Sequence, residues 1–287
     1  MKWLGYKGAR YVGFFFLLLP AFTASFTQYT SGRDLNQKNI KYGSDGKQAL
    51  DLYVPKNNRD NPVIIYVHGG GWMRGDKADV GDKPAFFTDN GYVFVSVNYR
   101  LFPNADYEKM ATDVATAVKW VFDHAEQYQI DRRRINLMGH SAGGHLVTLI
   151  GTNQSYLKQV GLPPGTIHSI VNLDGPIDLA EFLQRNSKYK TVFGEDDQVW
   201  TKASPITYAT EQNSPPVLLV SPKRPSISSF IERTNDKAKT FEIHSLSHGE
   251  IKKLLGSGNA PEEAANMTNA VAEFLHSVNY SGRPPLP

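Results

Sequence analysis

A Gly-His-Ser-Ala-Gly-Gly run at residues 139–144 is the feature that most constrains what this chain can fold into. It follows an apolar, strand-like stretch at residues 135–138 and precedes a helix-like stretch at residues 145–150. Glycines on both sides of Ser141 permit a tight strand-to-helix turn, which exposes the serine hydroxyl above a sheet. The helix N-terminus beneath that turn favours developing negative charge. The run therefore predicts that Ser141 is a nucleophile.

A second glycine-rich run, His-Gly-Gly-Gly-Trp at residues 68–72, follows an apolar strand expected at residues 63–67. Acyl transfer generates an oxyanion, which preorganised N–H donors must stabilise. Consecutive glycines let bare backbone amides approach a substrate carbonyl. We expect the donors of this oxyanion hole to be the amides of Gly70, Gly71 and Ala142.

The base expected to serve Ser141 is His248. It is expected in a loop that follows an alternating strand at residues 239–243 and precedes a C-terminal helix at about residues 261–278. The chain order, serine first and histidine last, is the order that this kind of architecture requires. The other seven histidines are interpreted as structural, and His68 and His140 as packing in or lining the pocket.

Taken together, these residues resemble the α/β-hydrolases of the esterase group with an HGGGW oxyanion loop. That group includes hormone-sensitive-lipase-like esterases, feruloyl-esterase-like carboxylesterases and kynurenine formamidases. The resemblance covers roughly residues 40–280 and is densest in LDLYVP (50–55), HGGGWMRGDK (68–77), SVNYRL (96–101) and GHSAGGHL (139–146). It implies an α/β fold with an eight-stranded, mainly parallel sheet and helices on both faces. The alternation of strands and helices along the chain also predicts a mainly parallel sheet with helices on both faces.

The chain departs from this group at the acid of the catalytic triad. In the family the acid follows the seventh strand, which corresponds here to residues 217–220. The loop that follows, residues 221–228, reads SPKRPSIS and contains no Asp or Glu. An acid normally holds the imidazole in the correct tautomer and stabilises the imidazolium.

Several substitutes for the missing acid stay open. Asp174 directly follows the strand expected at residues 169–173, and Asp178 lies four residues further on, although a turn there also predicts capping carboxylates. Glu232 lies far along the next expected helix, and Glu250 is very close in sequence to His248. A Ser141–His248 dyad, with Ser226 or a backbone carbonyl fixing the tautomer, is the remaining alternative.

One catalytic domain is expected at residues 35–280, followed by a frayed tail at 281–287. Residues 1–25 carry Lys2, Lys7 and Arg10 before a short apolar run and small residues, which is typical of a signal peptide, or alternatively of an uncleaved anchor. We therefore expect a periplasmic or secreted protein that begins near residues 24–27, which the mass of the native N-terminus tests. Membrane association is expected only if the segment is uncleaved.

Composition indicates which ligands and partners are not expected. The net charge of +3 comes from the three basic leader residues, and without them basic and acidic residues are equal in number, so no nucleic-acid partner is expected. There is no cysteine and no zinc-binding signature, so neither a metal nor a cofactor is expected. The oligomeric state stays open.

The predicted function is hydrolysis of small carboxylic esters through an acyl-enzyme. An arylformamidase or a carbohydrate deacetylase would use the same machinery. A binding protein on a hydrolase scaffold is the alternative from another class, motivated by the missing acid. Residues 174–216 are expected to form a small cap, and their aromatic side chains either contact an aryl substrate or form the core of the cap.

Overall fold

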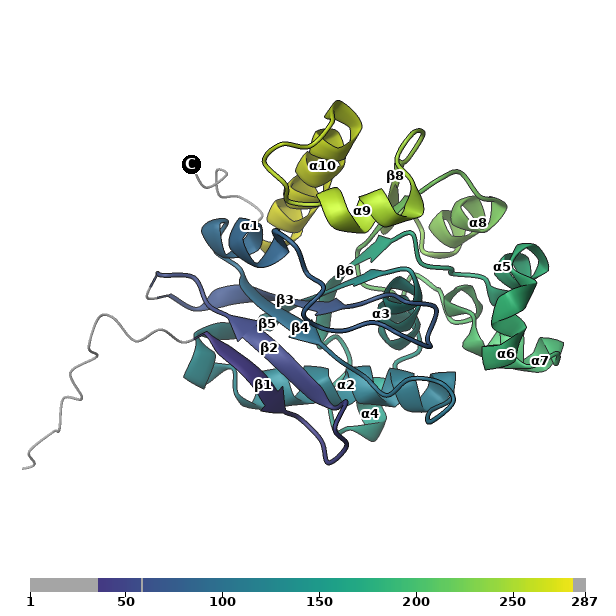
Figure 1. The fold of residues 1–287 in the computed structure, drawn as a ribbon, viewed down its shortest axis with the longest axis horizontal. Coiled ribbons are helices and arrows are strands. Elements are labelled where there is room, and N and C mark those ends of the chain that lie inside the picture. The colour runs from purple at the N-terminus through teal and green to yellow at the C-terminus, as the bar shows by residue number, and fades with distance from the viewer. Residues whose placement is uncertain (1–35, 58, 281–287) are drawn as a thin grey trace, which may run out of the picture. The chain divides into compact units, whose positions relative to one another are not determined.

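An eight-stranded sheet is the centre of the computed structural model, which describes residues 36–57 and 59–280 (Figure 1). The strand order is β1-β2-β4-β3-β5-β6-β7-β8. β1 pairs antiparallel with β2 and β2 antiparallel with β4, whereas all other neighbours are parallel. This is the α/β-hydrolase architecture that the sequence predicted. The strands are β1 (Gln37–Lys41), β2 (Ala49–Tyr53), β3 (Asn61–Val67), β4 (Val93–Val97), β5 (Ile130–His140), β6 (Ile167–Leu173), β7 (Val217–Ser221) and β8 (Ala238–Glu242).

The central strands are buried along their length, as β3, β4 and β7 illustrate. Strands of a parallel sheet are covered on both faces, which is why these sequences read as continuous apolar runs instead of alternating ones. The edge strand β8 is more exposed, with three of its five residues exposed to solvent. Burial on both faces requires a helical layer on each side.

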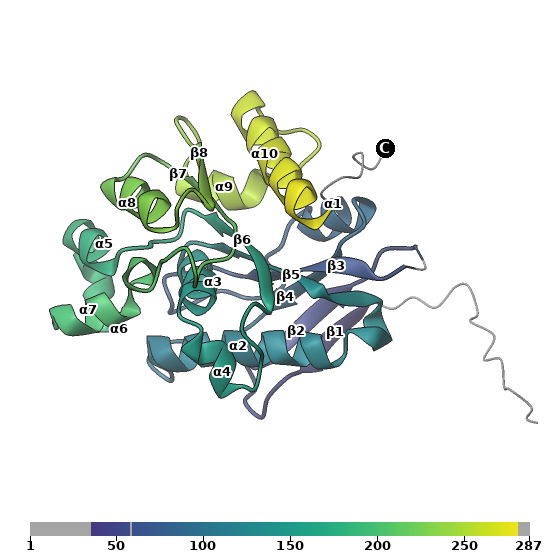
Figure 2. The same cartoon turned by 180° about the vertical axis from the view of Figure 1, so that it is seen from behind.

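Two helical layers provide that cover (Figures 1 and 2). One apolar core includes side chains of α2, α3 and α8, and the other includes side chains of α1, α9 and α10. The helices are α1 (Lys83–Asp89), α2 (Tyr107–Asp123), η1 (Glu126–Tyr128), α3 (Ala142–Thr152), α4 (Ser155–Gln159), α5 (Leu179–Arg185), η2 (Ser187–Tyr189), α6 (Lys190–Phe193), α7 (Asp197–Ala203), η3 (Pro205–Thr207), α8 (Pro225–Arg233), α9 (His248–Leu254) and α10 (Glu262–Asn279).

The segment between β6 and β7 forms the short elements α5 to η3, where a small cap was expected. Its aromatic side chains pack mostly among themselves and against Trp72: Phe182, Tyr189 and Phe193 each make a ring contact with the indole. Trp200 is buried as well. These contacts agree with the interpretation of the aromatics as core.

The predicted leader at residues 1–25 and the tail at 281–287 lie outside the described residues, so both stay predictions. Among the helices of residues 36–57 and 59–280, none has the length and apolar character needed to cross a membrane.

Candidate active site

Every residue predicted to take part in catalysis follows the carboxyl end of a parallel strand. The oxyanion loop follows β3, Ser141 follows β5, Asp174 follows β6, and His248 follows β8. The carboxyl ends of parallel strands meet at one edge of a sheet, which is where open α/β sheets bind their ligands. The fold therefore gathers side chains that are more than 100 residues apart in sequence.

Ser141 occupies a strained turn between β5 and α3, with φ 55° and ψ −120°. A β-carbon on Gly143 would lie 2.0 Å from the carbonyl oxygen of Val67, so the turn packs too closely against β3 for any side chain there. The backbone N–H of Ser141 donates to the carbonyl of Leu173 at 2.9 Å, which fixes the turn to β6. Among the described residues the Ser141 hydroxyl has no hydrogen-bond partner. Ser141 is therefore fixed by its backbone, and its hydroxyl is available to a substrate.

The amides predicted to form the oxyanion hole are also free. In the described part of the chain, the N–H groups of Gly70, Gly71 and Ala142 donate to no backbone or side-chain acceptor. Gly70 and Gly71 both have positive φ values, 123° and 63°, which is why side-chain-bearing residues are disfavoured at these positions. Free N–H groups beside a nucleophile are the arrangement that stabilises an oxyanion.

Trp72 anchors the oxyanion loop to the domain. Its side chain is 1% exposed, and its indole N–H donates to Nδ1 of His145 on α3 at 3.2 Å. His145 in turn donates from Nε2 to the carbonyl of Ala203 at 2.7 Å. Burial lowers the pKa of His145 to about 4, so the ring is neutral and Nδ1 accepts the indole proton. The loop, the helix under Ser141 and the cap are thereby joined through one buried chain of hydrogen bonds.

Replacing Trp72 with alanine is expected to lower the free energy of unfolding by about 3–5 kcal/mol, because it leaves a large cavity and an unpaired His145. Urea unfolding measures this. Met73 provides a matched control: it is adjacent in the chain and 41% exposed, so Met73→Ala should change stability by no more than about 0.5 kcal/mol. Equal effects of the two substitutions would contradict the anchoring role of Trp72.

His248 lies next to Asp174. Its Nδ1–H donates to Oδ2 of Asp174 at 2.5 Å, which leaves Nε2 as the ring nitrogen without a partner among the described residues. The Asp174 side chain is only 6% exposed and that of His248 is 53% exposed. Asp174 has a positive φ of 55°, an unusual value for a residue with a β-carbon, and its N–H donates to the carbonyl of Val220. The end of β6, and not the loop after β7, thus presents the acid to the histidine.

The sequence predicted a loop at His248, and this prediction is wrong: His248 is the first residue of helix α9. Ser247 and Glu250 form a capping box there: each side chain accepts a hydrogen bond from the other residue's backbone N–H. Such reciprocal capping starts a helix at a defined residue. The imidazole is therefore carried by a helix terminus with a fixed direction.

His140, the residue before Ser141, holds the same helix terminus. Its Nε2–H donates to the carbonyl of His248 at 2.8 Å, and the two rings are 4.6 Å apart. Burial, followed by the proximity of His248, lowers the pKa of His140 to about 4, so it stays a neutral donor. His140 thus links the turn that carries Ser141 to the helix that begins at His248.

Comparison with known proteins assigns this arrangement to a family. The family model described as BD-FAE matches residues 50–228, more than half of the chain. The chain belongs to the BD-FAE family. These are hormone-sensitive-lipase-like esterases with the α/β-hydrolase fold, so the resemblance drawn from the sequence is confirmed.

Individual relatives of this BD-FAE chain are esterases and a formamidase. The chain is 29% identical over 277 residues to esterase LipC of Mycobacterium tuberculosis, with 87% of this chain and 67% of LipC aligned. A probable isoprenylcysteine α-carbonyl methylesterase of Arabidopsis thaliana is 28% identical, but only 39% of its length is aligned. Kynurenine formamidase of Drosophila melanogaster is 26% identical, with 86% of this chain and 85% of the formamidase aligned.

Among solved structures, a truncated carbohydrate esterase from gut microbiota is similar in fold to the BD-FAE chain. The TM-score is 0.69 at 21% sequence identity, with 84% of this chain and 96% of the esterase aligned. This likeness supports the fold alone.

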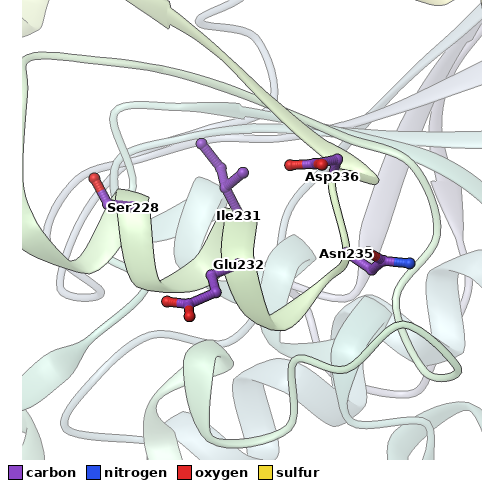
Figure 3. A pocket seen from close by; sticks show the side chains of 5 residues that line it. All are labelled: Ser228, Ile231, Glu232, Asn235 and Asp236. Atoms are coloured by element: carbon purple, nitrogen blue, oxygen red, sulfur yellow. The ribbon is translucent and has the colours of Figure 1, made fainter.

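The other residues considered for the role of the acid make other hydrogen bonds or line another part of the surface. Asp178 caps α5 by accepting the N–H of Glu181 at 3.1 Å, and Glu250 caps α9. Glu232 lines a hollow on the outer side of α8, together with Ser228, Ile231, Asn235 and Asp236 (Figure 3). Ser226 donates its backbone N–H to Glu181. None of these four residues has a hydrogen bond with His248 among the described residues, whereas Asp174 does.

One contact in the BD-FAE site was not anticipated from the sequence. Arg224, in the loop that lacks the acid, donates from Nη2 to the second oxygen of Asp174, Oδ1. The sequence did contain a signal for this contact. Arg224 precedes a proline, which restricts its backbone, and it lies in the loop where the family places its carboxylate. In the described part of the chain, no group of three or more His, Asp or Glu side chains is placed to hold a metal ion.

Proposed function

We propose that this BD-FAE chain hydrolyses carboxylic esters of small molecules through an acyl-enzyme on Ser141. The observation that carries the proposal is the contact of His248 Nδ1 with Asp174. Ser141, which has a strained backbone, and the oxyanion loop with its free amides follow other parallel strands at the same edge of the sheet. A nucleophile, a base that a carboxylate orients, and an oxyanion hole are the parts that acyl transfer needs.

In this mechanism Nε2 of His248 accepts the Ser141 proton as Oγ attacks the ester carbonyl. The amides of Gly70, Gly71 and Ala142 bind the resulting oxyanion. The protonated His248 then donates its proton to the leaving alcohol as the carbon–oxygen bond breaks, and the acyl-enzyme forms. Water, deprotonated by His248, hydrolyses the acyl-enzyme and releases the carboxylic acid and Ser141.

Asp174 keeps the proton of His248 on Nδ1, so that Nε2 faces the reaction as an acceptor, and it stabilises the imidazolium that forms. This assignment removes the motive for interpreting the chain as a binding protein, because the acid missing from the loop after β7 has a substitute at the end of β6. It also makes a Ser141–His248 dyad unnecessary.

Formamide hydrolysis is the second candidate, because the similarity to kynurenine formamidase spans more than four-fifths of both chains. The same groups would act on a formamide, and protonation by His248 would then release an amine. Deacetylation of a carbohydrate requires no other groups either. The choice depends on which leaving group the cap admits.

A substrate comparison tests the proposal. We expect the chain from about residue 26 to hydrolyse short acyl aryl esters with a kcat/KM at least about tenfold above that for N-formylkynurenine. A tenfold ratio corresponds to about 1.4 kcal/mol in transition-state binding. Acetylated xylan and feruloyl esters extend the comparison to carbohydrate substrates. A preference for the formamide by more than tenfold would reverse the assignment, and absence of turnover on all four would contradict it.

A further inference from the structure

Arg224 is the cation closest to the contact between His248 and Asp174. Its guanidinium donates to Oδ1 of Asp174 while His248 donates to Oδ2, so the carboxylate is held from both sides. We propose that Arg224 is a positioning residue for the triad: from the loop after β7, which carries no acid, it fixes the orientation of Asp174 and reduces the negative charge that Asp174 presents to His248. This inference rests on the proposed esterase function.

The backbone at Arg224 is set by its neighbours. Residues before a proline are restricted to extended conformations, and Arg224, followed by Pro225, has φ −144° and ψ 146°. One residue further on, the N–H of Ser226 donates to Oε2 of Glu181 at 3.0 Å, which ties the start of α8 to α5. The side chain of Arg224 is 22% exposed, so it is partly shielded from water. The loop therefore presents the guanidinium in a defined place.

Asp174 needs such a partner because its side chain is almost completely buried. A buried carboxylate is costly unless hydrogen bonds and opposite charge compensate it. His248 occupies only one of the two oxygens. Arg224 supplies the charge-assisted hydrogen bond to the other oxygen, which also restricts rotation of the carboxylate.

The charge of Arg224 also affects His248. A cation beside Asp174 opposes a second positive charge on the imidazole, so it favours the neutral ring that acts as the base. Removing that cation favours the protonated ring, and the acid limb of the pH profile of kcat/KM should then move to higher pH.

Few other charged or titratable groups face this contact. His140, from the end of β5, stays neutral in the working range because burial lowers its pKa to about 4. Lys252, on α9, pairs with Asp79. Glu250, also on α9, is exposed and engaged by Ser247. A shift of the acid limb is therefore attributable to Arg224 if these groups are left unchanged.

The test compares Arg224→Met with Arg224→Lys. In Arg224→Met we expect the acid limb of kcat/KM to move up by about one pH unit and kcat to fall about tenfold, because both the charge and the donor are lost. Lysine keeps a positive charge and a donor, so Arg224→Lys should stay within about threefold of wild-type kcat and keep the wild-type acid limb. Lys223→Met is the matched control, since Lys223 is exposed in the same loop and should behave as wild type.

The results for the Arg224 variants either support or overturn the inference. An acid limb and kcat in Arg224→Met equal to those of wild type would overturn the inference, as would a lysine variant that is as impaired as the methionine variant. If Arg224→Met does not fold, Arg224→Gln repeats the removal of charge and should show the same upward shift; an unshifted limb there would overturn the inference as well. Inactivity of wild type and Lys223→Met would instead contradict the proposed esterase function, so the two failures are distinguishable.

Discussion

Ser141→Ala is expected to lower kcat for short acyl esters by about 10⁶-fold, the size of effect seen when the nucleophile of a serine hydrolase is removed. The hydroxyl has no partner among the described residues, so its removal leaves the turn and its backbone hydrogen bond to Leu173 in place. The loss should therefore appear in turnover and not in stability. Steady-state kinetics together with thermal unfolding measure both.

Ser229→Ala is the control for this variant, because Ser229 is exposed on the outer side of α8 and should change neither quantity. If Ser141→Ala retained more than about a hundredth of wild-type turnover, another nucleophile would have to carry the reaction.

Asp174→Asn is expected to lower kcat by about 10³- to 10⁴-fold. The structure gives a specific reason. Arg224 is a donor, so it should bind the amide oxygen of the new asparagine, which turns the amide NH₂ group toward His248. Nδ1 must then accept a proton instead of donating one, and the proton of the neutral ring moves to Nε2. In that tautomer His248 cannot act as the base for Ser141.

Asp178→Asn provides the control, because Asp178 is four residues away and asparagine is as good an N-cap as aspartate. Turnover within about twofold of wild type is expected for that variant. A strong loss in Asp178→Asn combined with near-normal turnover in Asp174→Asn would show that the contact at the end of β6 does not supply the acid.

Most of the fold was predictable because its signals are local. The strands before the HGGGW run and before Ser141 are short continuous apolar runs, and residues 107–123 have the apolar spacing of an amphipathic helix. The two glycine runs predicted where backbone must approach backbone, and the contact of Gly143 with Val67 is an example. Ser141 and the oxyanion amides could be proposed as site residues for the same reason.

The acid was harder to predict because its identity depends on contacts between distant segments. Asp174 and Asp178 lie in one short run that reads as a turn, and both are plausible caps by sequence. The structure separates them: Asp178 does cap a helix, whereas Asp174 directly follows β6 and lies beside His248. The contact of Arg224 with Asp174 could not be predicted for the same reason, because nothing in the local sequence shows that the loop after β7 faces the end of β6. The start of α9 at His248 depended on a capping box, Ser247 to Glu250, which is visible in the sequence.

Labelling of the folded protein by a fluorophosphonate, followed by mass spectrometry of the modified peptide, tests the central claim most directly. The reagent reacts with a serine only where a base activates it and an oxyanion hole receives the phosphonyl oxygen. We expect one adduct, on Ser141, that forms rapidly in wild type, far more slowly in Asp174→Asn and not in Ser141→Ala. An unlabelled Ser141 in the folded wild-type protein, or an adduct on a different residue, would contradict the central claim.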